Sequence, residues 1–197
     1  SFDYDAHMFA FKKKYFLIIE SIKDIDLNNI KKKHKFDIIY RFNKKYENIS
    51  KLKLFRKSCK CKAIGFYVAN DTNLTVKLNA DGLYVSAYNK KLNFLKLKNS
   101  KYKIIGSAHN LKELNLKVLQ GCENILISRL FKTDYSYKND YMGVIKFNFF
   151  SKIRKGTLSV LGGVRLSNLN KLKLVNSNYV AILSEVKKKP AISSRLF

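Results

Sequence analysis

Short runs of apolar residues, rich in Ile, Val, Phe and Tyr, recur along the whole chain. Each run is too short for a buried helix, and its apolar positions are continuous rather than alternating. This pattern is typical of strands that are covered on both faces of a parallel sheet. We therefore predict eight strands, over Tyr15–Ile19, Phe36–Tyr40, Ala63–Ala69, Gly82–Ser86, Lys103–Ser107, Asn124–Ser128, Leu158–Gly162 and Tyr179–Leu183.

Stretches of helical character lie between these runs, and the clearest covers Leu111–Gly121. Leu111, Leu114 and Val118 are spaced to share one face of a helix there. Asn110 stands at the position of an N-cap, and the final glycine stands where helices commonly end. The spacing therefore predicts an amphipathic helix between the fifth and sixth strands.

Strands that alternate with helices imply parallel βαβ units, and eight is the number at which such units close into a barrel. We predict an α/β fold, a minimal (β/α)8 TIM barrel with short helices, because such barrels have about 250 residues and rarely fewer than about 200. The strand count alone leaves an open, doubly wound sheet as an alternative. No Pro/Gly/Ser-rich linker interrupts the pattern. We expect a single domain over residues 1–197, with an N-terminal arm at 1–14 and a C-terminal tail at 187–197.

The chain is strongly basic, with 40 Lys and Arg residues against 14 Asp and Glu residues and a formal charge of +26. A basic excess suits nucleic acid, because lysine and arginine release counterions from phosphates. However, 34 of the basic residues are lysines scattered in short runs and only six are arginines, the residues that read bases and clamp phosphates. We interpret the lysines mainly as solvated surface, and we keep a basic nucleic-acid-binding protein as an alternative function.

Other features of the composition exclude some classes of protein. No stretch approaches the ~20 apolar residues of a membrane-spanning helix. Cys59, Cys61 and Cys122 are too few, and odd in number, for a disulfide framework. The first residues carry acids where a signal peptide would carry positive charge. We therefore expect a cytoplasmic protein.

Candidate functional residues follow the predicted strands, which is where the functional residues of such barrels lie. Gly162 and Gly163 follow the seventh strand, a place where backbone N–H groups of these barrels often bind phosphate, and Ser184 can add a hydroxyl from the next loop. Glycine allows the backbone to approach an anion closely, although a Gly-Gly pair is also an ordinary tight turn. Cationic, amide and hydroxyl groups follow the other strands, so the predicted mouth suits a phosphorylated ligand.

Five segments of the chain, in order, resemble motifs of the thiamine phosphate synthases. They are Asn70–Leu74 with Ala80–Val85, Ile105–Leu114, Phe131–Thr133, Leu161–Val164 and Tyr179–Ser184. Each motif is weak alone, but the order is that of the family and the match runs from about the second strand to the eighth. The resemblance extends to related enzymes that tautomerise a thiazole carboxylate phosphate.

The resemblance implies a transferase that couples hydroxymethylpyrimidine diphosphate to a thiazole phosphate with the help of Mg²⁺. It assigns catalytic roles on the departing diphosphate to Arg41, Lys44 (Asn43 by strict spacing) and Ser107. It assigns substrate binding to Asn70, Thr133, Lys138, Gly162, Gly163 and Ser184, and metal binding to Asp71 and Asn89. The implied partners are phosphorylated small molecules, without a specific nucleic acid or a membrane, and a homodimer stays open.

This chain departs from the family pattern in the diphosphate and magnesium half of the site. A neutral amide, Asn89, stands where the family has a second carboxylate, which implies weaker Mg²⁺ binding. Tyr84 and Ile39 replace a histidine and a glutamine of the family motifs. The phosphate cradle is better preserved. A thiazole tautomerase-like isomerase and a diverged, non-catalytic binder of phosphorylated ligands therefore remain alternatives.

Overall fold

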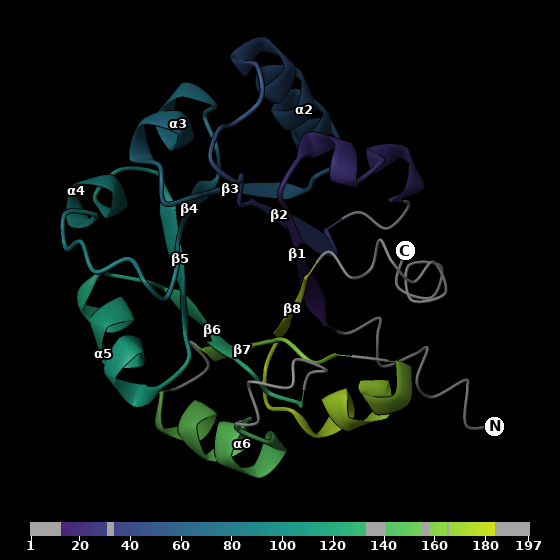
Figure 1. Ribbon diagram of the computed structural model, residues 1–197, viewed down its shortest axis with the longest axis vertical. Helices are drawn as coiled ribbons and strands as arrows, with labels where there is room; N and C mark the ends of the chain where they lie inside the picture. The colour runs from purple at the N-terminus through teal and green to yellow at the C-terminus, as the bar shows by residue number, and fades with distance from the viewer. Residues whose placement is uncertain (1–12, 31–33, 133–140, 155–157, 165, 184–197) are drawn as a thin grey trace.

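Eight parallel strands form a closed barrel in the computed structural model, which describes residues 13–30, 34–132, 141–154, 158–164 and 166–183. Each strand pairs with the next along the chain, and β8 closes the barrel against β1. Figure 1 shows the helices arranged in a ring around these strands. The strands are β1 Lys14–Ile19, β2 Phe36–Tyr40, β3 Gly65–Ala69, β4 Gly82–Val85, β5 Lys103–Ala108, β6 Asn124–Ser128, β7 Leu158–Leu161 and β8 Tyr179–Leu183.

Helices follow most of the strands. The α-helices are α2 Ile49–Cys61, α3 Thr72–Lys77, α4 Leu95–Lys98, α5 Leu111–Leu119 and α6 Val144–Ile153, and the 3₁₀ helices are η1 Ile22–Asp24, η2 Leu27–Asn29 and η3 Leu166–Leu174. The predicted (β/α)8 barrel is therefore confirmed, with short helices, and the open sheet is excluded. The predicted arm lies almost wholly outside the described residues, and the predicted tail entirely so. Within the described segments, no helix has the length and apolar character needed to cross a membrane.

Apolar residues fill two layers, one on each face of the strands. The interior of the barrel is packed by side chains such as Phe16, Tyr67 and Leu126. The larger layer lies between the strands and the helices, and includes Phe66 and Phe147. Because both faces are covered, β2 is buried along its whole length. This explains why the strands appear in the sequence as continuous apolar runs.

The helix α5 begins as predicted but buries a different face. Asn110 is its N-cap, with its Oδ1 accepting a hydrogen bond from the Glu113 N–H at 2.9 Å. Leu114 is buried, but Leu111 and Val118 are 51% and 44% exposed. The apolar face that these three residues form is therefore only partly buried.

Two polar side chains of α5 and the residue after it, Lys117 and Gln120, are buried instead. Space for the lysine stem comes from Gly106 on β5, where a Cβ atom would lie 2.9 Å from Lys117 Cδ. The helix therefore faces β5 with a long polar side chain that apolar periodicity does not reveal.

Candidate functional site

The amino-terminal end of the barrel contains a polar hollow of about 480 Å³, but its acidic residues are engaged in the fold. Asp37 accepts a hydrogen bond from the Gly65 N–H at 2.9 Å and pairs with Lys14 at 3.1 Å. Asp81, the residue before β4, accepts one from the N–H of β3 residue Phe66 at 2.7 Å and another from Arg56 at 3.0 Å. These carboxylates hold neighbouring elements together, so this end is a structural part of the barrel.

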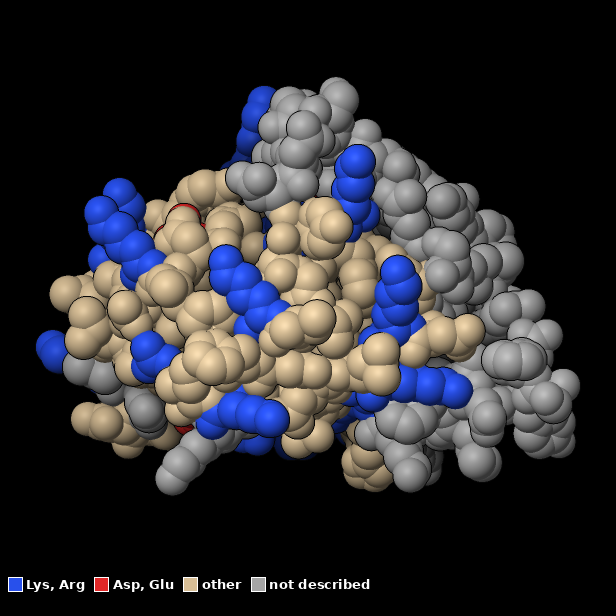
Figure 2. Space-filling model, turned by 90° about the horizontal axis from the view of Figure 1, so that it is seen from below, with Lys and Arg blue, Asp and Glu red and all other residues tan. Residues whose placement is uncertain are grey.

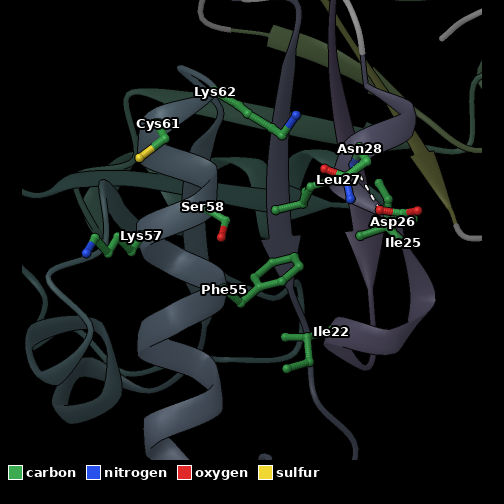
Figure 3. Close-up of a pocket in the computed structure, with 10 residues that line it drawn as sticks. All are labelled: Ile22, Ile25, Asp26, Leu27, Asn28, Phe55, Lys57, Ser58, Cys61 and Lys62. Atoms are coloured by element: carbon green, nitrogen blue, oxygen red, sulfur yellow. Dashed lines mark hydrogen bonds between the residues drawn. The ribbon is translucent and has the colours of Figure 1, made fainter.

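A second hollow, of about 460 Å³, lies outside the barrel between α2 and the segment that carries η1 and η2. Figure 3 shows Phe55 projecting from α2 toward that segment, which contributes Ile22, Ile25 and Leu27. None of the predicted site residues lines this hollow. Its apolar wall does not match a phosphorylated ligand, so the carboxyl end of the barrel remains the candidate site.

Asn70 and Asn89 lie together at the carboxyl ends of β3 and β4. Asn70 has a left-handed backbone (φ 59°), and its Oδ1 accepts hydrogen bonds from the Ser86 N–H and from Asn89 Nδ2, both at 3.0 Å. Its Nδ2 donates to Ser86 Oγ at 3.1 Å. These bonds fix the side chain of Asn70 at the rim of the barrel.

Asp71 follows directly and is the N-cap of α3, with Oδ1 accepting a hydrogen bond from the Leu74 N–H at 2.8 Å. Asn89 Oδ1 accepts one from the Lys91 N–H at 3.1 Å. In the part of the chain that the structure describes, no group of three or more His, Cys, Asp or Glu side chains could hold a metal. Asp71 and Asn89 offer one carboxylate and one amide oxygen, which are ligand types that Mg²⁺ takes together with substrate phosphate and water.

Ser107 lies inside the barrel near the carboxyl end of β5 and is 5% exposed. Its hydroxyl accepts a hydrogen bond from the Tyr84 hydroxyl at 2.8 Å, and its own hydrogen can still be donated to a ligand. Burial raises the pKa of the Tyr84 hydroxyl, although the bond to Ser107 and the charge of Arg41 lower it in part. Tyr84 therefore stays a neutral donor that orients Ser107.

Arg41 follows β2, and its guanidinium makes a 3.5 Å ion pair with Glu20, which follows β1. Both side chains are substantially exposed, so the pair contributes little to stability and leaves the arginine able to bind another anion. Lys44 lies in the same loop, is exposed and has a positive φ of 34°. The side chain of Asn43 accepts a hydrogen bond from the Lys44 N–H at 3.0 Å.

Gly162 and Gly163 follow β7 with φ angles of 85° and 74°. A Cβ atom at Gly163 would lie 2.4 Å from the carbonyl oxygen of Phe131, so the loop after β6 packs directly on this glycine. Asn168 Nδ2 donates to the Gly163 carbonyl at 2.7 Å. Among the described residues, nothing accepts a hydrogen bond from either glycine N–H. These two backbone donors are therefore the candidates for binding an anion at this loop.

The remaining predicted residues, Thr133, Lys138 and Ser184, lie outside the described residues. Sequence reasoning did not assign roles to Tyr84, Lys117 or Gln120. Tyr84 could have been noticed, because it replaces a histidine of a family motif. Lys117 and Gln120 could not, because their residue types are those of an ordinary surface helix.

Figure 2 shows one outer face of the molecule, on which lysine and arginine side chains are dispersed among uncharged residues. Nucleic-acid sites gather such charges into a patch or stripe. On the face shown, the distribution is that of a solvated surface.

Comparisons with known proteins show the family of the chain. A family model described as thiamine monophosphate synthase matches residues 37–186. A thiamine-phosphate synthase of Prochlorococcus marinus is 28% identical over 155 residues, which cover 76% of this chain and 44% of that protein. One of Pelagibacter ubique is 30% identical over 145 residues, covering 71% of this chain and 69% of that protein. The chain thus spans less than half the length of the first of these relatives.

Solved structures show the same architecture. A thiamine phosphate pyrophosphorylase from Pyrococcus furiosus superposes with a TM-score of 0.73 at 16% identity, covering 94% of this chain and 93% of that one. A second, from Bacteroides thetaiotaomicron, gives a TM-score of 0.60 at 13% identity over 90% and 85% of the two chains. At these identities the likeness concerns the fold.

Proposed function

Because the chain belongs to the thiamine monophosphate synthase family, we propose that it joins a hydroxymethylpyrimidine diphosphate to a thiazole phosphate and releases diphosphate. The observation that carries this proposal is the division of the barrel mouth. Arg41 follows β2, Asn70 follows β3 and Ser107 lies on β5, whereas Gly162 and Gly163, whose N–H groups have no acceptor among the described residues, follow β7. Two phosphorylated substrates need two such groups of donors.

The reaction we propose breaks the bond between the pyrimidine methylene carbon and the diphosphate oxygen. The electron pair leaves with the diphosphate, and the pyrimidine ring stabilises the cation that remains. The lone pair of the thiazole nitrogen then forms the new carbon–nitrogen bond. Charge develops on the departing diphosphate, so preorganised donors there lower the barrier most.

In this proposal Arg41 and Ser107 hold the departing diphosphate. The guanidinium exchanges its exposed pair with Glu20 for a bidentate contact with phosphate oxygens. The Ser107 hydroxyl, oriented by Tyr84, donates its free hydrogen to the same group. Lys44, or Asn43 beside it, approaches from the loop after β2 and adds a further donor.

We propose that Mg²⁺ lies at the neighbouring position, where Asp71 would supply a carboxylate and Asn89 an amide oxygen. The ion would neutralise charge on the diphosphate. Asn89 contributes no charge, so we propose that the ion depends on the substrate phosphates for much of its affinity. The amide cluster orients the side chains on which the diphosphate rests.

The thiazole phosphate is proposed to lie at Gly162 and Gly163, where the absence of Cβ atoms allows close approach. Thr133, Lys138 and Ser184 keep their predicted roles as further ligands of this half. The single-domain organisation and the homodimer likewise stay predictions.

The direct test mixes purified protein with both phosphorylated precursors and Mg²⁺, and measures thiamine phosphate by mass spectrometry. We expect product, and we expect EDTA to abolish it. Turnover of a thiazole carboxylate phosphate that persists in EDTA would instead indicate the isomerase. Absence of product together with absence of thiazole phosphate binding would overturn the proposal. A log-linear salt dependence of binding to DNA or RNA would then favour the nucleic-acid alternative.

A further inference from the structure

Two buried polar side chains, Lys117 in α5 and Gln120 just after it, fasten the loop that follows β4. Lys117 Nζ donates to the Asn89 carbonyl at 2.9 Å and to Gln120 Oε1 at 2.8 Å. Gln120 Nε2 donates to the same carbonyl at 2.8 Å and to the Lys91 carbonyl at 2.7 Å. Both side chains belong to residues with no exposed surface. The two side chains thus hold the loop from the α5 side, and both donate to the carbonyl oxygen of Asn89.

Burying an amino group that can carry charge is costly unless it is well hydrogen-bonded. Among the described residues, none of the ion pairs includes Lys117, and the oxygens that accept its hydrogen bonds are neutral. An apolar side chain could fill the same space without this cost. The lysine stem also needs the gap left by Gly106, since a Cβ there would approach it to 2.9 Å. Packing alone therefore does not account for Lys117.

The other side of the loop faces the mouth. Asn89, whose carbonyl α5 holds, donates through its side chain to Asn70 Oδ1 at 3.0 Å. Asn70 in turn bonds to Ser86 through both polar atoms of its side chain. A continuous series of hydrogen bonds therefore runs from α5, through the loop, to the amides at the rim beside Asp71.

We propose that Lys117 and Gln120 are positioning residues for the diphosphate half of the mouth. They act through the Asn89 backbone and set where the Asn70 and Asn89 side chains stand. The expected kinetic effect rests on the proposed function. The structural coupling between α5 and the loop is independent of it. Small displacements of binding groups cost large factors in rate, up to ~10²-fold for about 1 Å.

The test compares Lys117→Met with Leu114→Ala, which removes a buried apolar side chain from the same helix without touching the loop. In Lys117→Met we expect the KM for the pyrimidine diphosphate to rise roughly tenfold and kcat to fall, whereas the KM for the thiazole phosphate stays unchanged. Leu114→Ala should lower stability but change neither KM. If both variants alter the two KM values alike, Lys117 has a structural role only and the inference is wrong.

A second readout does not depend on activity. Hydrogen exchange of the Asn89 and Lys91 amides should quicken in Lys117→Met and stay unchanged in Leu114→Ala, relative to global unfolding. Gln120→Met gives the same expectation should Lys117→Met fail to fold. Unchanged exchange in this loop would overturn the inference. Faster exchange in a protein that makes no thiamine phosphate would sustain the coupling and reject the proposed function.

Discussion

The two ends of the barrel use their polar groups in different ways. At the amino end, Asp37 and Asp81 each accept a hydrogen bond from a backbone N–H of β3 and pair with a basic side chain. At the carboxyl end, Arg41 makes an exposed pair with Glu20, and the N–H groups of Gly162 and Gly163 have no acceptor within the described residues. Polar groups whose hydrogen bonds are satisfied within the fold stabilise it, whereas donors and charges without a strong partner in the fold can bind ligands. Substitutions at the two ends should therefore separate stability from activity.

The largest expected effect is on activity, in Arg41→Ala. We expect kcat/KM to fall ~10²–10³-fold, because the variant loses charge stabilisation on the departing diphosphate. The free energy of unfolding should change by less than ~0.5 kcal/mol, since the pair with Glu20 is exposed. Kinetics and urea denaturation measure the two quantities. Glu20→Ala is the control for loss of the pair, and should keep activity. Comparable activity in Arg41→Ala would remove this residue from the mechanism.

Asp81→Ala should have the opposite effect: it should lower stability and leave the kinetics of the folded protein unchanged. The Phe66 N–H and the Arg56 guanidinium each lose an acceptor, and an unsatisfied, largely buried donor costs about 1–3 kcal/mol. We expect a loss of about 2–3 kcal/mol in unfolding free energy, with both KM values unchanged in the folded protein. Urea denaturation gives the unfolding free energy, and steady-state kinetics in the same buffer give the two KM values. A rise in either KM without loss of stability would place a ligand at the amino end instead.

Gly163→Ala tests the glycine pair. The new Cβ would lie 2.4 Å from the Phe131 carbonyl oxygen, so the loop after β7 must shift. We expect the KM for the thiazole phosphate to rise roughly tenfold, an effect of about 1.4 kcal/mol, and the KM for the pyrimidine diphosphate to stay constant. Gly143→Ala is a matched control, because Gly143 has the same φ of 74° but open space around its Cβ position. Equal effects in both variants would show that backbone strain alone is responsible.

The smallest expected effect is in Asn89→Asp, which restores a carboxylate beside Asp71. The Mg²⁺ concentration for half-maximal activity should fall about fivefold, an effect of about 1 kcal/mol, although the bond to Asn70 is lost. Asn110→Asp adds the same charge at a neighbouring loop and preserves the α5 N-cap. If the control shifts the Mg²⁺ dependence equally, the effect is one of general charge.

The strands could be predicted closely because a strand that is buried on both faces has a continuous run of apolar residues. The bounds of β2 and β6 are those predicted, whereas β3 begins two residues later than expected. Ala63 and Ile64 are apolar but belong to the turn before β3, where Ala63 has a φ of 54°. Apolar character alone does not reveal a change in backbone direction.

The site was partly predictable for a related reason. Asn70 and Asn89 follow adjacent parallel strands, so the topology places them together, and the structure shows them hydrogen-bonded. Lys117 could not be found in this way. Its burial depends on the space beside Gly106 and on a carbonyl 28 residues away in the sequence. Such contacts become visible only when the helix is placed against the sheet.

The proposed function requires a phosphoryl group to bind at the carboxyl end of the barrel rather than at the amino end, where lysines and Arg56 also line the polar hollow. An NMR titration of ¹⁵N-labelled protein with the thiazole phosphate tests this directly. We expect the amide resonances of Gly162 and Gly163 to shift with saturation, and those of Gly65 and Gly82 to remain in place. Saturable shifts at Gly65 and Gly82, with none at the pair after β7, would contradict it.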